Sequence, residues 1–466
     1  SGETPTERGP RFCSGRSARR TPAMDHDDLL DQILALARGA GADEADCLIA
    51  ERTALDLSWR LGALEELERK EAREIGLRVL VGKRMATAAS TRTDPATLRS
   101  MVEETVSAAR LLPEDAWAGL ARPDELATGY AELDLVDPEE PTVASLELAA
   151  AAAEDAARAV PGVTNSEGAS ASWSRSRIVL GASNGFRGAT ARTRHGLGVT
   201  VLAGAGTAMQ RDHVYRQAAH RADLPPPEAI GREAGERTAR RVDPRKVATQ
   251  RVPVVYEPRV AASLLRHLAA AIGGDAVASG RSFLKDRLGQ AVFAPGITVT
   301  DAPLRPRGLA SRAFDGEGVG STDRRLIDDG VLTTWLLDLA TGRRLGMAST
   351  GHASRGGAAL GAPSATNLTL CAGSTTPEAM IADIAQGFYV TELMGMGVNI
   401  VTGDYSRGAS GFWIENGQIG YPVSEVTVAG NLARMFEALV PASDLEIHGS
   451  TDAPTVRIDG LTVAGT

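Results

Sequence analysis

The feature that most constrains the fold is a stretch near the C-terminus in which glycine recurs every few residues. Residues 391–425 hold seven glycines between short apolar runs, namely Gly395, Gly397, Gly403, Gly408, Gly411, Gly417 and Gly420. Glycine at this density is typical of tight turns and close backbone approach, and it argues against a regular helix. Short strands are therefore expected at 398–401, 411–415, 418–422 and 425–428. The pair Asn416-Gly417 between two apolar runs predicts a hairpin turn. The segment from Asp404 to Arg407 is expected on a loop between strands, where functional residues tend to lie.

Length and charge narrow the class of protein. At 466 residues, with 43% hydrophobic and 23% charged residues, the chain is long enough for two or three globular domains. A net charge of −9 argues against a general nucleic-acid-binding surface. No apolar run approaches the roughly 18 residues of a membrane span, so no membrane segment is expected. Three scattered cysteines, Cys13, Cys47 and Cys371, favour buried thiols in a reducing cytoplasm over a disulfide framework or a cysteine zinc site.

The N-terminal segment 1–23 is polar and rich in arginine, with no apolar core. This composition does not match a secretory signal, so we expect a disordered tag or an upstream translated segment that precedes a start at Met24. Such a segment has few apolar residues to offset the entropy of ordering, and its deletion is expected to leave stability unchanged.

Residues 24–245 predict an α+β domain made of two similar units. Each unit begins and ends with a helix and has strands of alternating polarity in between. The first has helices at 25–38 and 94–112, with Asp94 as N-cap and Pro95 at the first helical position, and strands at 45–50, 54–59, 64–69 and 75–81. The second has helices at 141–160 and 228–241, and strands at 163–174, 177–182, 185–193 and 198–205. This likeness indicates a weak internal repeat, although ordinary alternation of helices and strands would give the same order.

A polar joint at 240–244 separates this domain from a β-rich, glycine-rich domain at 246–466. The second domain is expected to start with a strand at 252–256 and a helix at 258–271. From residue 297 onward, short strands alternate with glycine-rich turns, with helices near Arg344 and at 377–386. The predicted fold class is α+β, with mostly antiparallel sheets and flanking helices.

Five segments in a fixed order along the chain resemble the TldD/PmbA family, also called modulators of DNA gyrase. They are FDGEGV at 314–319, DDGVLTTWLL at 328–337, LGMASTGHA at 345–353, TGDYSRGASGFWIENG at 402–417 and IDGLTVAGT at 458–466. The resemblance runs from about Met24 to the end and is closer to the PmbA (TldE) branch than to TldD. It implies a soluble bacterial metalloprotease in which a zinc-carrying TldD subunit pairs with a TldE subunit and cleaves unfolded or small peptides. The negative net charge argues against reading the gyrase name as direct DNA binding.

For the TldD branch, the resemblance implies an HExxxH helix in which two histidines bind zinc and the glutamate acts as general base. In this chain the corresponding helix contains His267, but Leu268 stands at the glutamate position and Ile272 at that of the second histidine. In the alternative register, Leu265 and Ala270 occupy the two histidine positions. Either way the base and at least one ligand are missing. No zinc is therefore expected on this chain, and zinc is implied on the partner subunit.

The rest of the sequence offers no other catalytic set. Where TldD supplies a further thiolate ligand, residues 447–450 contain no cysteine. The histidines lack HxxxH or HxxEH spacing, although a scattered set can still assemble in three dimensions: His195, His213, His220, His267, His352 and His448. A Gly-x-Ser-x-Gly nucleophile elbow and a phosphate-binding loop are also missing.

Two functions from different classes follow. The first is a TldE-like subunit that pairs with a TldD-like HExxxH subunit and completes the cleft for an unfolded peptide, for example by adding the peptide to a sheet edge. The second is a non-enzymatic binding or regulatory protein that acts on gyrase or toxin–antitoxin control without a protease partner. Co-purification with a chain that carries HExxxH distinguishes the two. A free-standing hydrolase has the least support.

Four residues are expected to face the cleft between the subunits: His352, Asp404, Tyr405 and Arg407. Charged and aromatic side chains set among glycines are poor core fillers, and glycine lets their backbone approach a partner closely. Arg407 is expected to hold a carboxylate of the partner, or the terminal carboxylate of the peptide, through paired hydrogen bonds. The alternative is an internal ion pair between Asp404 and Arg407 that merely ties the loop.

Overall fold

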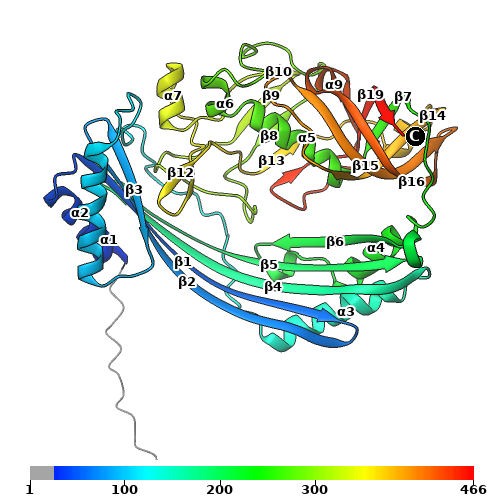
Figure 1. Ribbon diagram of the computed structural model, residues 1–466, viewed down its shortest axis with the longest axis horizontal. Coiled ribbons are helices and arrows are strands. Elements are labelled where there is room, and N and C mark those ends of the chain that lie inside the picture. Colours follow the sequence, from blue (N-terminus) through cyan, green and yellow to red (C-terminus); the bar gives the residue numbers. More distant parts are fainter. Residues whose placement is uncertain (1–25, 466) are drawn as a thin grey trace, which may run out of the picture.

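The computed structural model describes residues 26–465, so the predicted tag segment 1–23 lies outside the described residues. The two halves of the chain form separate layers. A long, curved sheet makes up most of the N-terminal half, and a body of shorter strands and helices makes up the C-terminal half that faces it (Figure 1). Between residues 26 and 465, no helix is both long enough and apolar enough to cross a membrane.

The N-terminal sheet has six antiparallel strands in the order β3-β2-β1-β4-β5-β6. They are β1 (Glu44–Arg60), β2 (Ala63–Val81), β3 (Arg84–Ser90), β4 (Val163–Ala182), β5 (Arg187–Ala203) and β6 (Gln210–Ala218). Four helices accompany them, α1 (His26–Gly39), α2 (Pro95–Leu111), α3 (Val143–Arg158) and α4 (Pro227–Ala239). Each unit therefore runs helix, three strands, helix. The order of helix, strands and helix is as predicted, but each unit has three strands where the sequence predicts four. The two units meet where β1 pairs with β4.

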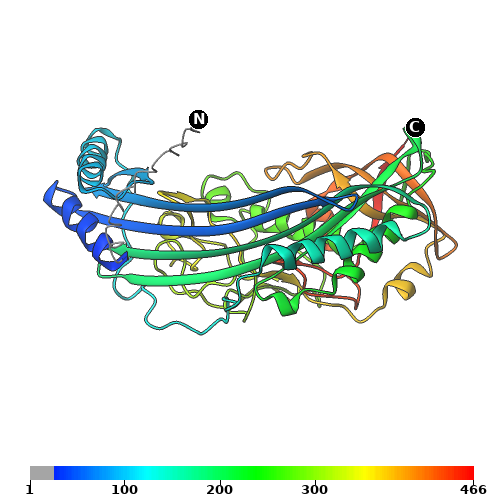
Figure 2. The same cartoon turned by 90° about the horizontal axis from the view of Figure 1, so that it is seen from below.

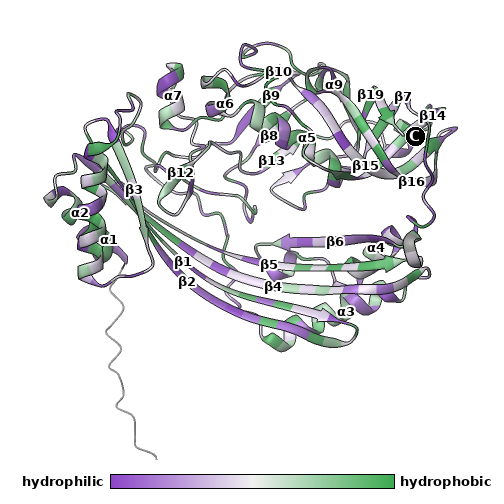
Figure 3. Ribbon diagram, viewed as in Figure 1, coloured by the Kyte–Doolittle hydropathy of each residue, from purple (hydrophilic) through white to green (hydrophobic). Residues whose placement is uncertain are grey.

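Alternation along the strands explains where the helices pack. Ile49, Ile75 and Leu77 point to one side of the sheet and are buried against α1 and α2. Leu57 and Trp173 use the same side to contact α3 and α4. The two helix pairs thus cover opposite ends of one face (Figure 2). The other face turns toward the C-terminal half, and hydrophilic and hydrophobic residues alternate along the strands (Figure 3).

Local signals predict the helix starts correctly, but not the strand lengths. Asp94 caps α2 by accepting a hydrogen bond from the backbone N–H of Thr97 at 3.0 Å, and Pro95 takes the first helical position. The predicted separate strands at 45–50 and 54–59 are wrong, because β1 continues through the polar residues between them. Likewise, 64–69 and 75–81 belong to one strand, β2, since Glu51↔Arg73 and its neighbours keep the ladder paired. The same holds for β4 and β5, and the sequence analysis predicts neither β3 nor β6.

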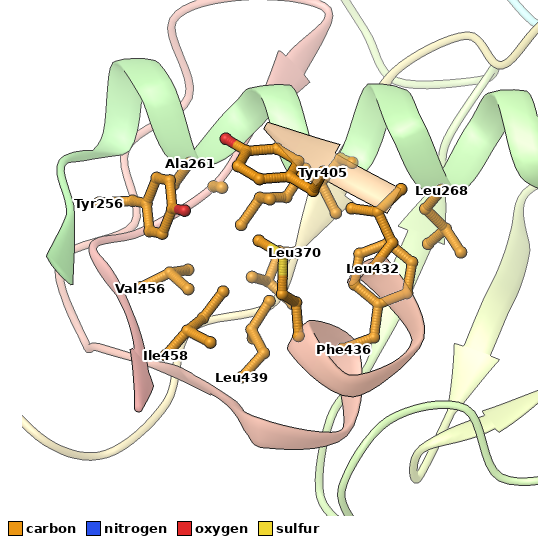
Figure 4. Close-up of a cluster of buried hydrophobic side chains, with 14 of the residues drawn as sticks. Tyr256, Ala261, Leu268, Leu370, Tyr405, Leu432, Phe436, Leu439, Val456 and Ile458 are labelled. Carbon is orange, nitrogen blue, oxygen red and sulfur yellow. The ribbon is translucent and has the colours of Figure 1, made fainter. Parts of the chain in front are cut away.

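In the C-terminal half, five strands close into a barrel. The order is β16-β15-β14-β7-β19, pairing of β16 with β19 closes the ring, and β17 adds to the side of β19. The strands are β7 (Gln250–Tyr256), β14 (Gln386–Met394), β15 (Asp404–Glu415), β16 (Gln418–Asn431), β17 (Leu439–Pro441) and β19 (Val456–Ala464). Helix α5 (Pro258–Ala271) packs against the barrel, and side chains from both form the largest buried cluster of the described chain (Figure 4).

A second, smaller sheet lies beside the barrel in the order β10-β9-β8-β13-β18. Its strands and the β11–β12 hairpin are β8 (Val299–Asp301), β9 (Arg324–Asp328), β10 (Val331–Leu332), β11 (Ser354–Gly356), β12 (Ala359–Gly361), β13 (Leu368–Leu370) and β18 (Thr451–Asp452). The short helices are α6 (Gly274–Ala278), α7 (Leu339–Leu345), α8 (Pro377–Ile381) and α9 (Leu432–Ala438), with single 3₁₀ turns at Gly206–Ala208 and Arg221–Asp223. Strand pairing is antiparallel except for β7 with β14 and β13 with β18. The fold is α+β, as predicted.

The glycine-rich stretch forms part of the barrel wall. Asn416 and Gly417 have positive φ angles of 51° and 75°, and they make the predicted hairpin turn, here between β15 and β16. Glycine is required at Gly411, because a Cβ there would lie 1.9 Å from the carbonyl oxygen of Tyr389 on β14. The predicted strand at 398–401 is wrong, since only Val398 makes an isolated bridge in the loop between β14 and β15.

Candidate functional site

A pocket of about 460 Å³ lies between the two halves of the molecule. The N-terminal half contributes β6 and α4, and the C-terminal half contributes α5 and the loop at 444–453. Its polar lining is made by His213, Tyr215, Arg216, Glu233, Arg237, Glu257, Arg259, Arg266, Asp444, Glu446, His448 and Asp452. We call this the central pocket. Its volume and its mixture of apolar wall and charged groups suit a small-ligand or peptide site.

Buried ion pairs join the two halves at one wall of the central pocket. Asp212 on β6 lies 3.1 Å from Arg241, just after α4, and 3.0 Å from Arg259 at the start of α5. Glu257, which precedes α5, pairs with Arg237 of α4 and, at 3.2 Å, with Arg259. Burial alone would raise the pKa of Asp212, but the arginines around it, Arg259 foremost, lower it to about 2. The carboxylate is therefore ionised at neutral pH and ties β6 to α5.

The guanidinium groups of the pocket differ in how they are neutralised. Arg216 pairs with Glu233, and its Nη2 donates to both carboxylate oxygens, at 2.9 and 2.7 Å. Arg266 on α5 forms no ion pair with any carboxylate of residues 26–465. Burial and the nearby charge of Arg407 lower the pKa of Arg266.

The loop at 444–453 forms the acidic side of the pocket. His448 Nε2 lies 2.8 Å from Glu446 Oε2. Asp452 Oδ1 accepts hydrogen bonds from the backbone N–H groups of His448 and Gly449, at 3.1 and 2.8 Å. Asp444 accepts from the backbone and the hydroxyl of Thr455, at 2.9 and 2.7 Å. These contacts fix the loop, so its carboxylates are held in place beside the pocket.

The free edge of β6 also borders the central pocket. The backbone N–H and C=O of His213 point outward from this edge. The N–H donates to the side chain of Asp212 at 2.7 Å, and the carbonyl accepts from Arg259 at 3.0 Å. Backbone direction alternates along an antiparallel strand, so Tyr215 also presents its N–H and C=O outward. The Tyr215 carbonyl accepts from Arg216 at 3.3 Å. No backbone group of residues 26–465 outside the sheet ladder accepts the Tyr215 N–H.

Comparison with known proteins identifies the family of this chain. Three family models match the chain: PmbA/TldA metallopeptidase domain 1 at 45–109, the central domain at 132–242 and the C-terminal domain at 249–465. The chain belongs to the PmbA/TldA metallopeptidase family. The central domain contains β6 and α4 and the C-terminal domain contains α5, so the central pocket lies where two family domains meet.

Individual relatives agree over nearly the whole length. Metalloprotease PmbA of Escherichia coli is 36% identical over 441 residues, which span 94% of this chain and 96% of that protein. A metalloprotease TldD homologue of Haemophilus influenzae is 28% identical over 210 residues, 41% of this chain and 44% of that protein. Both branches of the family are therefore related to this chain, and the PmbA branch matches it over a much longer span.

Solved structures share the fold. A modulator of DNA gyrase from Bacteroides thetaiotaomicron superposes with a TM-score of 0.87 at 26% identity, covering 95% of this chain and 100% of that one. TldE from Thermococcus kodakarensis superposes with a TM-score of 0.82 at 18% identity, covering 94% and 100%.

The residues at the central pocket do not fit the zinc ion that a metallopeptidase family implies. The α5 side chains that line it are Pro258, Arg259, Ala262 and Arg266, and none of these residue types is a zinc ligand. The histidines and carboxylates elsewhere in the described lining do not come together in a group of three. His267 faces the barrel instead, with its ring 6.1 Å from that of Tyr405 in an edge-to-face arrangement. Within residues 26–465, no three His, Cys, Asp or Glu side chains gather closely enough to hold a metal.

Two of the four residues predicted to face a cleft lie inside the chain. Tyr405 is 1% exposed and belongs to the core between β15 and α5 (Figure 4). His352 is 2% exposed, with Nε2 3.0 Å from Asp301 and Nδ1 2.8 Å from Thr350. The expectation that both point outward is therefore wrong for the chain by itself. Burial raises the pKa of Tyr405 to about 12, so its phenol is neutral.

The other two predicted residues remain accessible, but they lie on a strand and not on a loop. Asp404 pairs with Asn431 and Arg407 with Val428, so they are the first and fourth residues of β15. Asp404 is exposed and accepts a hydrogen bond from the hydroxyl of Thr402 at 2.7 Å. Asp404 and Arg407 form no ion pair with each other. The alternative hypothesis, an internal ion pair that ties this segment, is therefore wrong. A role for Asp404 and Arg407 at a partner interface stays a prediction.

Sequence reasoning missed the charged residues that line the central pocket, above all Glu257, Arg259 and Arg266, and also Asp212, which pairs with Arg259. One signal was available. Arg259 and Arg266 stand seven positions apart on a predicted helix whose other residues are almost all apolar. Seven positions are about two helical turns, so these two cations share one face of α5.

Proposed function

We propose that this chain is the non-catalytic, TldE-like subunit of a two-chain zinc metalloprotease that cleaves unfolded or small peptides. One observation carries the proposal. In a member of a metallopeptidase family, the α5 face at the central pocket presents Arg259, Ala262 and Arg266 and no metal ligand. The zinc and the general base then come from a TldD-like subunit with an HExxxH motif. The existence of relatives named TldD and TldE supports two kinds of chain.

In this proposal, the chain binds and aligns the peptide. The outward N–H of Tyr215 on the free edge of β6 is available to an extended peptide as an added strand. The outward C=O accepts one bond of 3.3 Å from Arg216 and has a second acceptor position for the peptide. Main-chain hydrogen bonds of this kind do not depend on side-chain identity, which suits substrates that share no sequence. The charged lining of the central pocket then holds the polar groups of the bound chain.

We place the complex in the cytoplasm, without direct binding to nucleic acid. Cys47 and Cys371 are free thiols, and burial raises the pKa of Cys47. Unreactive free thiols of this kind suit a reducing compartment. The net charge of −9 disfavours a phosphate backbone as a partner.

Reconstitution tests the proposal. The chain is purified alone, the HExxxH family member from the same genome is purified alone, and the two are then mixed. We expect no stoichiometric zinc and no peptidase activity for this chain alone, co-elution of the two chains by size exclusion, and chelator-sensitive cleavage of casein by the mixture. Cleavage is expected to fall at least about 100-fold when the glutamate of the partner's HExxxH motif becomes glutamine, since general-base catalysis is typically worth 10²–10⁴.

The matched control is the glutamine form of the partner mixed with this chain, because it preserves assembly and removes only the base. One zinc per chain together with chelator-sensitive cleavage by the isolated chain would contradict the proposal. Failure of the two chains to co-elute would favour a binding protein that works without a protease partner.

A further inference from the structure

Arg266, which lines the central pocket, and Arg407 on β15, which lies outside the lining, have no countercharge among the described residues. Arg216, Arg237 and Arg259 each pair with a carboxylate. Arg266 and its neighbour Arg407 form no ion pair with any carboxylate of residues 26–465. Every other guanidinium of the pocket is neutralised by the fold, so this pair is the place where an external anion would be stabilised most.

The fold holds these two cations together from different elements. Arg266 lies on α5 and lines the central pocket. Alternation along β15 puts Arg407 on the same side as Tyr405 and Ala409, which are buried against α5. Arg407 donates from Nε to the carbonyl oxygen of Met394 at 3.1 Å. That bond orients the guanidinium and leaves its two terminal nitrogens without a partner among residues 26–465.

Each charge makes the other harder to accommodate. Burial lowers the pKa of His267, and Arg407 and Arg266 lower it further, to about 4, so this neighbouring imidazole is neutral at physiological pH. Burial and Arg407 also lower the pKa of Arg266. Arg407 is half-buried and Arg266 is exposed, so water weakens the repulsion between these like charges without removing it. An anion placed between them replaces that repulsion with two attractions.

We infer that Arg266, in the lining of the central pocket, and Arg407, next to it on β15, bind the C-terminal carboxylate of a peptide that lies along the pocket. The inference rests on the proposed function and adds a substrate class, namely peptides that present a free chain end. Guanidinium groups recognise carboxylates through paired, charge-assisted hydrogen bonds. A chain end fits the arrangement because the free edge of β6, at Tyr215, borders the same pocket and can hold the preceding residues.

Peptide binding to the full chain tests the inference. The probes are one short alanine- and serine-containing peptide labelled with fluorescein at its N-terminus, made once with a free C-terminal carboxylate and once with a C-terminal amide. Fluorescence anisotropy is measured on the isolated chain and on its complex with the glutamine form of the partner. We expect the free acid to bind about tenfold more tightly than the amide, the typical effect of one charge-assisted contact.

Three variants separate the site from general charge. Arg266→Gln and Arg407→Gln are each expected to bring the affinity for the acid down to that for the amide, with the amide unchanged. Arg99→Gln removes the same charge from the exposed surface of α2 and is expected to leave the preference intact. As a check on geometry in the folded protein, Arg407→Gln is expected to raise the pKa of His267, measured by NMR, because one of the two cations that depress it is gone.

Equal affinity of the unmodified chain for acid and amide would overturn the inference. So would variants that lose the partner in size exclusion but keep the preference for the acid, since the two cations would then serve a partner carboxylate. Failure of the proposed function gives a different result, because the two chains then do not co-elute while the isolated chain still prefers the acid.

Discussion

Glu317 is a buried carboxylate at the place where the N-terminal sheet meets the C-terminal half. It lies 3.3 Å from Arg78 on β2 and accepts the backbone N–H of Leu339 at 2.9 Å. Burial raises its pKa, Arg78 opposes this, Asp315 adds to it, and the result is about 7 against an ordinary value of 4.5. Between pH 4.5 and 7 the folded chain therefore holds a proton that the unfolded chain has released. The unfolded state binds fewer protons in this window, so the contribution of Glu317 to stability falls as pH rises.

Glu317→Gln removes this titration. The free energy of unfolding is compared between the unmodified protein and the variant at each pH. From pH 5 to pH 8 we expect the unmodified protein to lose up to about 3 kcal/mol relative to the variant, because the pKa of Glu317 differs between the folded and unfolded chain. Urea unfolding at several pH values measures it. The control is Glu66→Gln, an exposed carboxylate on β2, for which the difference from the unmodified protein should not change in this way. A pH-independent difference for Glu317→Gln would contradict the buried titration.

At the scale of one element, β6 matters because it is both an edge strand and a wall of the central pocket. Tyr215 directs its N–H away from β5, so Tyr215→Pro removes an edge donor and leaves the ladder between β5 and β6 intact. Proline is tolerated on edge strands for this reason. We expect the variant to fold, as judged by circular dichroism, and to bind the peptide about tenfold more weakly, a loss of the order of one hydrogen bond.

Tyr215→Ala is the matched control for that prediction, since it deletes the ring and keeps the N–H. If the backbone edge holds the peptide, the alanine variant retains most of its affinity and the proline variant does not. Equal loss in both would mean that the ring, and not the edge, makes the contact.

At the scale of the whole molecule, the buried ion pairs around Asp212 join the two halves. Asp212→Asn keeps the shape of the side chain but leaves Arg241 and Arg259 without their shared charge. Removing one partner from a buried ion pair typically costs roughly 3–5 kcal/mol, and we expect a loss of that order in the free energy of unfolding. Faster proteolysis of the segment 242–249 between the halves should accompany it.

The exposed Asp243, in the same connecting segment, provides the comparison. Asp243→Asn removes a carboxylate that forms no ion pair with another described residue, so stability and the rate of proteolysis should not change. Loss of stability in Asp212→Asn without faster cleavage at 242–249 would place the effect inside one half and contradict a joining role.

Sequence reasoning succeeded where a few neighbouring residues decide the outcome. The cap at Asp94 and the turn at Asn416-Gly417 depend on local backbone chemistry, and both form as predicted. It failed where distant pairing decides. Tyr405 looked like a surface residue among glycines, but the closing of the barrel places it against α5.

The ion pairs between the two halves could not be predicted from the sequence for the same reason. Asp212, Glu257 and Glu392 stand far apart in the sequence, and their carboxylates meet one set of arginines only after the two halves dock. A charged residue in a sequence is most simply interpreted as a solvated surface group, since its neighbours in the chain do not indicate that a distant residue will form an ion pair with it.

The closed barrel has a consequence for how the protein is made. Val456 on β19 pairs with Tyr256 on β7, 200 positions earlier, while β19 also pairs with β16. At synthesis rates of roughly 5–20 residues per second, β7 leaves the ribosome about 10–40 s before β19 is available. During that interval all six strands of the N-terminal sheet have been synthesised. The apolar side chains of β7 and α5 remain exposed to solvent, because the strands that bury them have not yet been made. The period in which this protein most needs a chaperone therefore falls in the second half of its translation.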